Sequence, residues 1–256
     1  MQDPSKFSHL SRILTRPDIL RDPASFFDVY QTPIRKFFSC LCRDSNEADE
    51  QFQEFAVKFL SGAFDNFNPE RGRFRDYLKT SLRNQVRRQA AKNAGLVAAG
   101  TEELLQNEAD PAVEQPVDVA MKAFDEVEGE HIRQLVEADM LDEERAGKNQ
   151  FHSLLRFAIS YQQQLTDPES NSASRRVPVS AVIEFVKESF GETISRDTAK
   201  QRMSRAKSAF ATKMILEIGT RIGDASISAV GQAASELGLA PFVGKELQRR
   251  KEAGES

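Results

Sequence analysis

Four basic side chains recur at intervals of four residues in the N-terminal half of the chain: Arg75, Lys79, Arg83 and Arg87. On an α-helix this spacing places them on one face, where like charges repel one another by roughly a few tenths of a kcal/mol per pair. Such a row is tolerable when an anionic partner lies along it, and a nucleic-acid backbone is the usual partner. We therefore interpret the row as a nucleic-acid-binding face, with a solvated helix face as the alternative.

An aromatic ring lies in the same segment. Tyr77, with Arg73, Asn84 and Arg88 nearby, could stack on an unpaired base. The alternative is that this ring packs against the neighbouring phenylalanines, which is the more common role of a lone helical aromatic.

A second basic segment has the pattern of a helix-turn-helix. Apolar residues at helical spacing predict a first helix over residues 179–190, which Gly191 can end in the left-handed conformation. Ser195 can then cap the second helix. In this role the second helix lays its N-terminal side chains on base edges in the major groove; the alternative is a helical hairpin with a basic solvent face. The polar face of the second helix carries Asp197, Lys200, Gln201, Ser204 and Arg205.

Enzymatic and metal chemistry have little support in the sequence. Paired carboxylates such as Glu50 and Glu54 could serve acid–base catalysis or hold a metal ion, but the three histidines fall in unrelated segments. Cys40 and Cys42 are the only cysteines, too few for a disulfide framework or a cysteine-built zinc site. We expect no catalytic residue, no metal and no cofactor.

The charges are segregated along the chain. The 256 residues carry a net charge of −4, but residues 71–92 sum to +7, residues 101–147 to −12 and residues 196–213 to +5. Two basic blocks on either side of an acidic stretch suggest two polyanion-binding modules. The apolar runs are far shorter than a membrane span, and the start lacks the apolar run of a signal peptide. We expect a cytoplasmic protein without a membrane partner or small-molecule substrate.

Almost every periodic segment of the chain predicts helix. Apolar stripes indicate helices over residues 24–42 and 74–86, and between them a helix that begins with a capping box at Asp44 and Glu47 and carries Leu60 inward. Beyond residue 219 we expect one more helix near residues 222–237 and a polar, frayed end over residues 245–256. The expected divisions are a Phe-rich domain at 20–92, an acidic linker at 93–118, a helical segment ending in the helix-turn-helix at 119–218 and a C-terminal extension at 219–256.

Both basic segments resemble a known family. Residues 27–92 are similar to region 2, the promoter-melting domain, of bacterial sigma factors of the sigma-70 family, especially the compact extracytoplasmic-function (ECF) type. The resemblance is carried by Glu47–Glu54, Phe67–Leu78 and Leu82–Arg88, although Tyr77 stands where the family usually has Trp. Ile194–Lys207 resembles the recognition helix of region 4. The two matches occur in the family's order, with a linker between them.

The resemblance implies a fold and a set of roles. The fold would be all-α, with a region 2-like domain and a C-terminal helix-turn-helix, and the partners would be bacterial core RNA polymerase, promoter DNA and in some members an anti-sigma factor. Docking on the polymerase would fall to Asp49, Glu50, Gln53 and Glu54. Contacts to the −10 element would fall to Arg73, Arg75, Tyr77, Lys79, Arg83, Asn84, Arg87 and Arg88. Contacts to the −35 element would fall to Arg196, Asp197, Thr198, Lys200, Gln201, Ser204 and Arg205.

Two other functions remain open at this point. One is a helix-turn-helix regulator that binds DNA without polymerase, and the other is a helical protein-interaction module whose basic faces are merely solvated. Binding to core polymerase would single out a sigma factor. A DNA affinity that does not change with salt would favour the interaction module, because phosphate binding must be salt-dependent.

Overall fold

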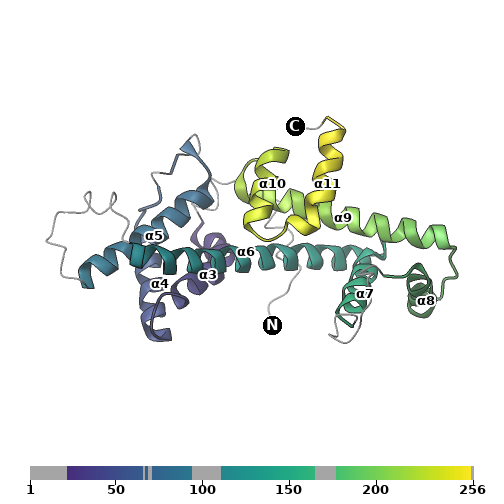
Figure 1. Ribbon diagram of the computed structural model, residues 1–256, viewed down its shortest axis with the longest axis horizontal. Helices are drawn as coiled ribbons and strands as arrows, with labels where there is room; N and C mark the ends of the chain where they lie inside the picture. The colour runs from purple at the N-terminus through teal and green to yellow at the C-terminus, as the bar shows by residue number, and fades with distance from the viewer. Residues whose placement is uncertain (1–21, 66, 69–70, 94–110, 165–176, 255–256) are drawn as a thin grey trace.

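The computed structural model describes residues 22–65, 67–68, 71–93, 111–164 and 177–254 (Figure 1). These residues form helices and connecting turns without any strand, which confirms the expected all-α fold class. None of the described helices is both long and apolar enough to cross a membrane. The helices are α3 (Pro23–Ser39), α4 (Ser45–Leu60), α5 (Phe74–Asn93), α6 (Pro111–Arg145), α7 (Phe151–Gln164), α8 (Val179–Phe190), α9 (Arg196–Ile222), α10 (Ile227–Glu236) and α11 (Ala240–Glu252).

Helix α6 runs along the length of the molecule and joins its two ends (Figure 1). Its 35 residues span about 50 Å at 1.5 Å per residue. It begins at Pro111, earlier than the expected start near residue 119, and its apolar stripe already packs in the N-terminal core from Val117 onward. Residues 94–110 of the expected linker lie outside the described residues.

A phenylalanine-rich core fills the space between α3, α4, α5 and the first half of α6. Phe26 stacks on Phe59 with ring centroids 3.9 Å apart, and Leu78 and Leu82 of α5 are fully buried in the same cluster. The capping signal at the start of α4 is confirmed. Asp44 Oδ1 accepts hydrogen bonds from the backbone N–H groups of Asn46 and Glu47, both at 2.9 Å.

The inward placement of Leu60 is wrong. Its side chain is 61% exposed, whereas its neighbour Phe59 is buried. Two consecutive residues of a helix lie about 100° apart around its axis, so the core-facing stripe of α4 has room for only one of them.

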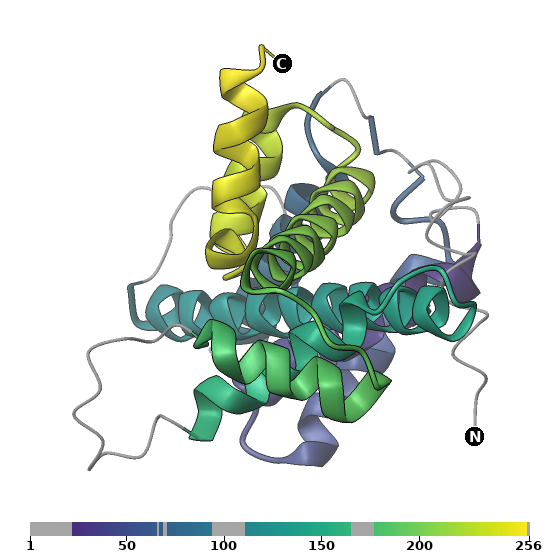
Figure 2. The ribbon, with the colours of Figure 1, turned by 90° about the vertical axis from the view of Figure 1, so that its right-hand side faces the viewer.

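A second core joins the later half of α6 to α9, α10 and α11. In both views α10 and α11 lie on one side of α9, and α7 and α8 lie on the other (Figures 1 and 2). The frayed end expected over residues 245–256 is also wrong, because α11 continues to Glu252. Val243 and Leu247, four residues apart on α11, bury one stripe of this helix in the second core.

The two helices of the expected helix-turn-helix have the expected ends. Helix α8 spans Val179–Phe190, and Gly191 ends it with a φ of 69° in the left-handed region. Ser195 caps α9 by accepting a hydrogen bond from the backbone N–H of Thr198 at 3.1 Å. Helix α9 then continues to Ile222. Its first turns form the recognition-like segment, and its later turns pack against α10 and α11 of the C-terminal extension.

Candidate nucleic-acid interface

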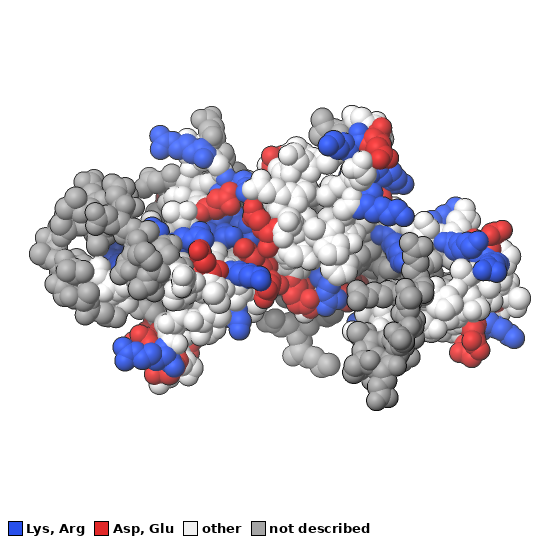
Figure 3. Space-filling view, viewed as in Figure 1, with Lys and Arg blue, Asp and Glu red and all other residues white. Residues whose placement is uncertain are grey.

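Helix α5 presents two different faces to the rest of the molecule. Its apolar face carries Leu78 and Leu82 into the phenylalanine-rich core. Its basic face, which we define as Arg75, Lys79 and Arg83 with the adjacent Arg73, turns toward the acidic helix α6 and the end of α10. Basic and acidic side chains are interleaved on the surface where these three helices meet (Figure 3).

Arg75 lies at the centre of an ionic cluster. Its guanidinium donates from Nη2 to Asp125 at 2.5 Å, from Nε to Glu128 at 2.8 Å and from Nη1 to Glu236 at 2.6 Å. The Arg75 side chain is only 1% exposed and the Glu128 side chain is fully buried. Burial alone would lower the pKa of Arg75, but the field of the three carboxylates, Glu128 foremost, raises the pKa above its ordinary value. The charge on Arg75 is therefore permanent and fully engaged.

The next two cations of the row also have carboxylate partners. Lys79 Nζ lies 2.9 Å from Asp125 Oδ2, and Arg83 Nη2 lies 3.2 Å from Asp118 Oδ1. Asp118 and Asp125 are seven residues apart on α6, which places them on one face, two helical turns from each other. The anionic partner that the row needs is therefore present within the chain itself. Arg87 is partly exposed beyond this contact.

The other side chains expected at the −10 element lie along the same helix. Arg73 pairs with Asp76 at 2.8 Å and approaches Glu236 at 3.7 Å. The Tyr77 ring contacts Phe64 and Phe67, with centroids 5.7 and 5.6 Å away, at the edge of the core. Asn84 and Arg88 are partly exposed.

The residues expected to dock on polymerase lie on the outer side of α4. Asp49, Glu50 and Gln53 are exposed, and Asp49 forms an ion pair with Arg35. Glu54 accepts a hydrogen bond from Lys58 at 2.7 Å, which lowers the pKa of the Glu54 carboxyl.

Two apolar side chains on the same helix were not expected there. Val57 and Leu60 are 65% and 61% exposed. With Glu50 and Gln53 they form a stripe at spacings of three and four residues, the pattern of a helix that pairs with another helix.

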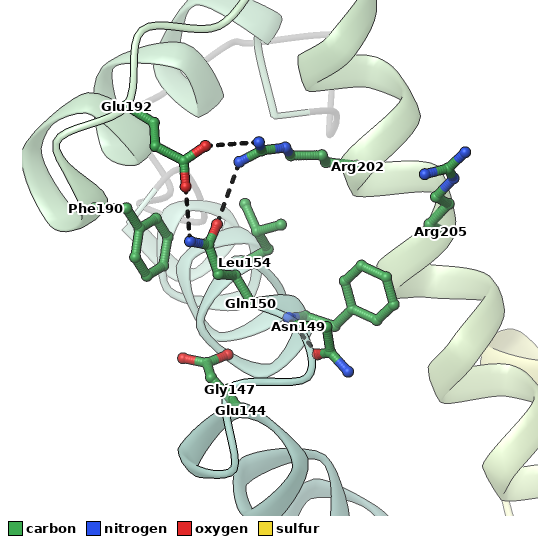
Figure 4. A pocket seen from close by; sticks show the side chains of 10 residues that line it. Glu144, Gly147, Asn149, Gln150, Leu154, Phe190, Glu192, Arg202 and Arg205 are labelled. Carbon is green, nitrogen blue, oxygen red and sulfur yellow. Dashed lines mark hydrogen bonds and ion pairs between the residues drawn. The ribbon is translucent and has the colours of Figure 1, made fainter.

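At the other end of the molecule a hydrogen-bonded triad holds the turn before the recognition-like helix. Arg202 of α9 donates from Nη2 to Glu192 at 2.6 Å and from Nη1 to Gln150 at 3.2 Å, and Gln150 donates to Glu192 at 2.9 Å (Figure 4). The triad lines a pocket of about 540 Å³ between the ends of α6, α7 and α8 and the first turns of α9. The hydrogen bond from Arg202 lowers the pKa of Glu192, so this carboxylate stays ionised near neutrality.

The face expected to read the −35 element is open to solvent. Thr198 is partly exposed, and its hydroxyl oxygen forms a hydrogen bond of 2.9 Å with the hydroxyl oxygen of Ser195. Lys200 lies 3.4 Å from Asp197, and both are exposed. The remaining exposed members of this face are Arg196, Gln201, Ser204 and Arg205. Helix α9 therefore presents its polar face outward and buries Ala199 and Ala206 against α7 and α8.

No metal site is evident in the described ranges. No group of three His, Cys, Asp or Glu side chains there is arranged to hold a metal ion. The carboxylates that gather around Arg75 are already engaged by that guanidinium and by Lys79.

Comparison with known proteins identifies the N-terminal part. Residues 26–95 match the family model of sigma-70 region 2. This part of the chain is similar to a sigma-70 region 2 domain. The matched segment contains most of α3 and all of α4 and α5, and therefore both the outer side of α4 and the basic face of α5. The comparisons with curated proteins and with solved structures gave no match.

Several functional contacts of this interface could not have been found in the sequence. Asp125, Glu128 and Glu236 lie 50, 53 and 161 residues beyond Arg75, so no local pattern joins them. The one available signal was the opposite charge of residues 71–92 and 101–147. Charge segregation predicts that two blocks attract, but it does not say which side chains meet.

Proposed function

We propose that the protein is a sigma factor that binds core RNA polymerase and directs promoter recognition and melting. The observation that carries the proposal is the sigma-70 region 2 match, which spans the exposed acidic side of α4 and the basic helix α5. In this role the protein is not itself an enzyme, because its partner carries out the polymerisation. The proposal includes assignment to the ECF type, action in the cytoplasm and control by an anti-sigma factor, all of which rest on the resemblance of residues 27–92 to that type.

The proposed docking surface is the stripe Asp49, Glu50, Gln53 and Glu54, extended by the exposed Val57 and Leu60. Carboxylates around exposed apolar side chains suit a partner helix that presents basic and apolar groups.

The proposed DNA contacts lie at the two ends of the molecule. The basic face of α5, with Asn84, Arg87, Arg88 and a Tyr77 ring released from its core contacts, would engage the −10 element partly as single strand. The face of α9 from Arg196 to Arg205 would read the −35 element as duplex. Specificity would come from using both elements at a fixed spacing on the polymerase, since phosphate contacts alone carry no sequence information.

A pull-down on immobilised core polymerase tests the docking surface. Glu50→Lys with Glu54→Lys should leave the helical fold intact, because neither side chain lies in the core, and should abolish co-purification. Glu184→Lys with Glu188→Lys on α8 is the matched control, with the same charge change at the same spacing. Undiminished binding by the Glu50/Glu54 pair would exclude this docking surface. If the wild-type chain binds duplex DNA tightly but not polymerase, it is a helix-turn-helix regulator instead.

A further inference from the structure

The C-terminal extension touches the basic face of α5 through one carboxylate. Glu236, the last residue of α10, places Oε2 2.6 Å from Arg75 Nη1 and Oε1 3.7 Å from Arg73 Nη2. The Glu236 side chain is 29% exposed, in contrast to the fully buried Glu128. Glu236 is therefore the most exposed of the three carboxylates that contact Arg75.

The position of Glu236 is fixed by close backbone packing. Gly129 of α6 lies so close to the end of α10 that a Cβ at this position would be 2.2 Å from the carbonyl oxygen of Leu237. Val230, Ala233 and Ala234 bury the other side of α10 in the second core. The helix that carries Glu236 is thus seated firmly, and Glu236 reaches Arg73 and Arg75 at the start of α5.

Ion pairs join α10 to the start of α5. Neither of the two large apolar clusters contains residues from both helices. Glu236 forms ion pairs with Arg73 and Arg75. Breaking these ion pairs uncovers no residue of either large apolar cluster, so other anions can replace Glu236 while α10 stays in place.

The cluster also cancels the positive charge at the N-terminal end of the face that would meet DNA. The three cations Arg73, Arg75 and Lys79 are opposed by four carboxylates, Asp76, Asp125, Glu128 and Glu236. The local sum is −1, so a phosphate backbone that approaches this end of α5 is repelled instead of attracted.

We propose that the C-terminal extension is a built-in competitor of DNA. Through Glu236 it holds Arg73 and Arg75 in a closed state in which the basic face of α5 cannot bind a phosphate backbone. The inference rests on the proposed DNA-binding role of α5 and gives the extension a function of its own. Opening requires that the Glu236 contacts break. Arg73 then keeps only its exposed partner Asp76, whereas Arg75 keeps its two partners on α6, so Arg73 is the first cation that a phosphate can engage.

The test measures binding of the full-length free protein to a fluorescent single-stranded DNA oligonucleotide by anisotropy across a salt titration. Glu236→Gln should bind more tightly than the wild type, with a log–log salt slope steeper by about 0.7 for each cation that is freed on a single strand. For one freed cation, lowering the salt from about 1 M to about 0.1 M should therefore raise the DNA affinity of the variant about five-fold more than that of the wild type. Glu252→Gln, an exposed carboxylate on α11 with the same change in net charge, should bind as the wild type does.

A charge-neutral variant tests the same contact by a different route. Gly129→Ala should push the end of α10 away from α6 and also raise DNA affinity. Gly244→Ala on α11, where an added Cβ meets nothing within 4 Å, should not. Circular dichroism and thermal melting confirm that each variant is folded.

Equal DNA binding by Glu236→Gln and the wild type, or an equal gain in Glu252→Gln, overturns the inference. The pull-down on core polymerase, carried out with the same proteins, judges the proposed function separately. A chain that binds polymerase but shows no gain in Glu236→Gln is a sigma factor without this competitor. A chain that does not bind polymerase fails the proposed function whatever its DNA affinity.

Discussion

Replacing Arg75 with alanine separates the two roles that the basic row of α5 could have. If the row were only a DNA-binding face, neutralising any of its members would leave the free protein as stable as before, or more stable because like charges repel. The observed contacts predict the opposite for Arg75. Its removal leaves the carboxylate of Glu128 buried beside Asp125 without its guanidinium partner.

The magnitude follows from this burial. Breaking a buried ion pair by removing one partner costs about 3–5 kcal/mol in free energy of unfolding. Glu128 Oε1 already accepts no hydrogen bond within the described residues, so little else can take over the role of the guanidinium. For a chain of this size the cost corresponds to a fall in Tm of about 6–20 °C, at about 2–4 °C per kcal/mol.

Chemical and thermal denaturation followed by circular dichroism measure this change, and Arg83→Ala is the matched control. Arg83 pairs with Asp118 at a site where both side chains are substantially exposed, so its loss should cost about 1 kcal/mol or less. If Arg75→Ala proved as mild as Arg83→Ala, the ionic cluster would not hold α5, α6 and α10 together, and the account of a closed basic face would be refuted.

Three further predictions follow from other parts of the molecule. Gly191→Ala forces an alanine to adopt a φ of 69° and should cost about 1–2 kcal/mol of stability, read by urea denaturation; an unchanged midpoint would mean that the turn relaxes. Burial, with Arg221 adding to the effect, lowers the pKa of His131 to about 4 from an ordinary value of 6.5. The unfolded chain therefore takes up the proton first, and Tm should fall as the pH drops from 6.5 to about 4. His131→Gln should flatten this dependence of Tm on pH, and identical profiles for the variant and the wild type would contradict the lowered pKa of His131. Lys200→Ala with Gln201→Ala should change which upstream sequences are used, by about 1–3 kcal/mol per lost base contact, whereas a uniform loss of affinity in a promoter-binding assay would make them phosphate contacts.

Local signals in the sequence predicted much of the framework. The cap at Asp44, the left-handed stop at Gly191 and the cap at Ser195 each depend on a few neighbouring residues, and all three are present. These features are predictable because a helix end satisfies its backbone groups with nearby side chains.

The contacts that decide the state of the basic face could not be predicted in the same way. The partners of Arg75 come from two distant helices, and their meeting depends on how the two cores share α6. Three cations of the row, Arg75, Lys79 and Arg83, have carboxylate partners within the chain. Sequence spacing cannot tell an external polyanion from a carboxylate of the same chain, so the nucleic-acid partner stays a prediction. The polar C-terminal end was misjudged for a related reason, since Val243 and Leu247 gain their burial only from the second core.

The central claim concerns transcription, and a reconstituted reaction tests it most directly. Purified core RNA polymerase is supplied with a library of bacterial promoter fragments, with and without this protein, and the 5′ ends of the transcripts are sequenced. The account predicts that adding the protein produces new start sites that share two upstream sequence elements at a fixed spacing, and that Glu50→Lys with Glu54→Lys removes them. Transcription that is identical with and without the wild-type protein would contradict the account.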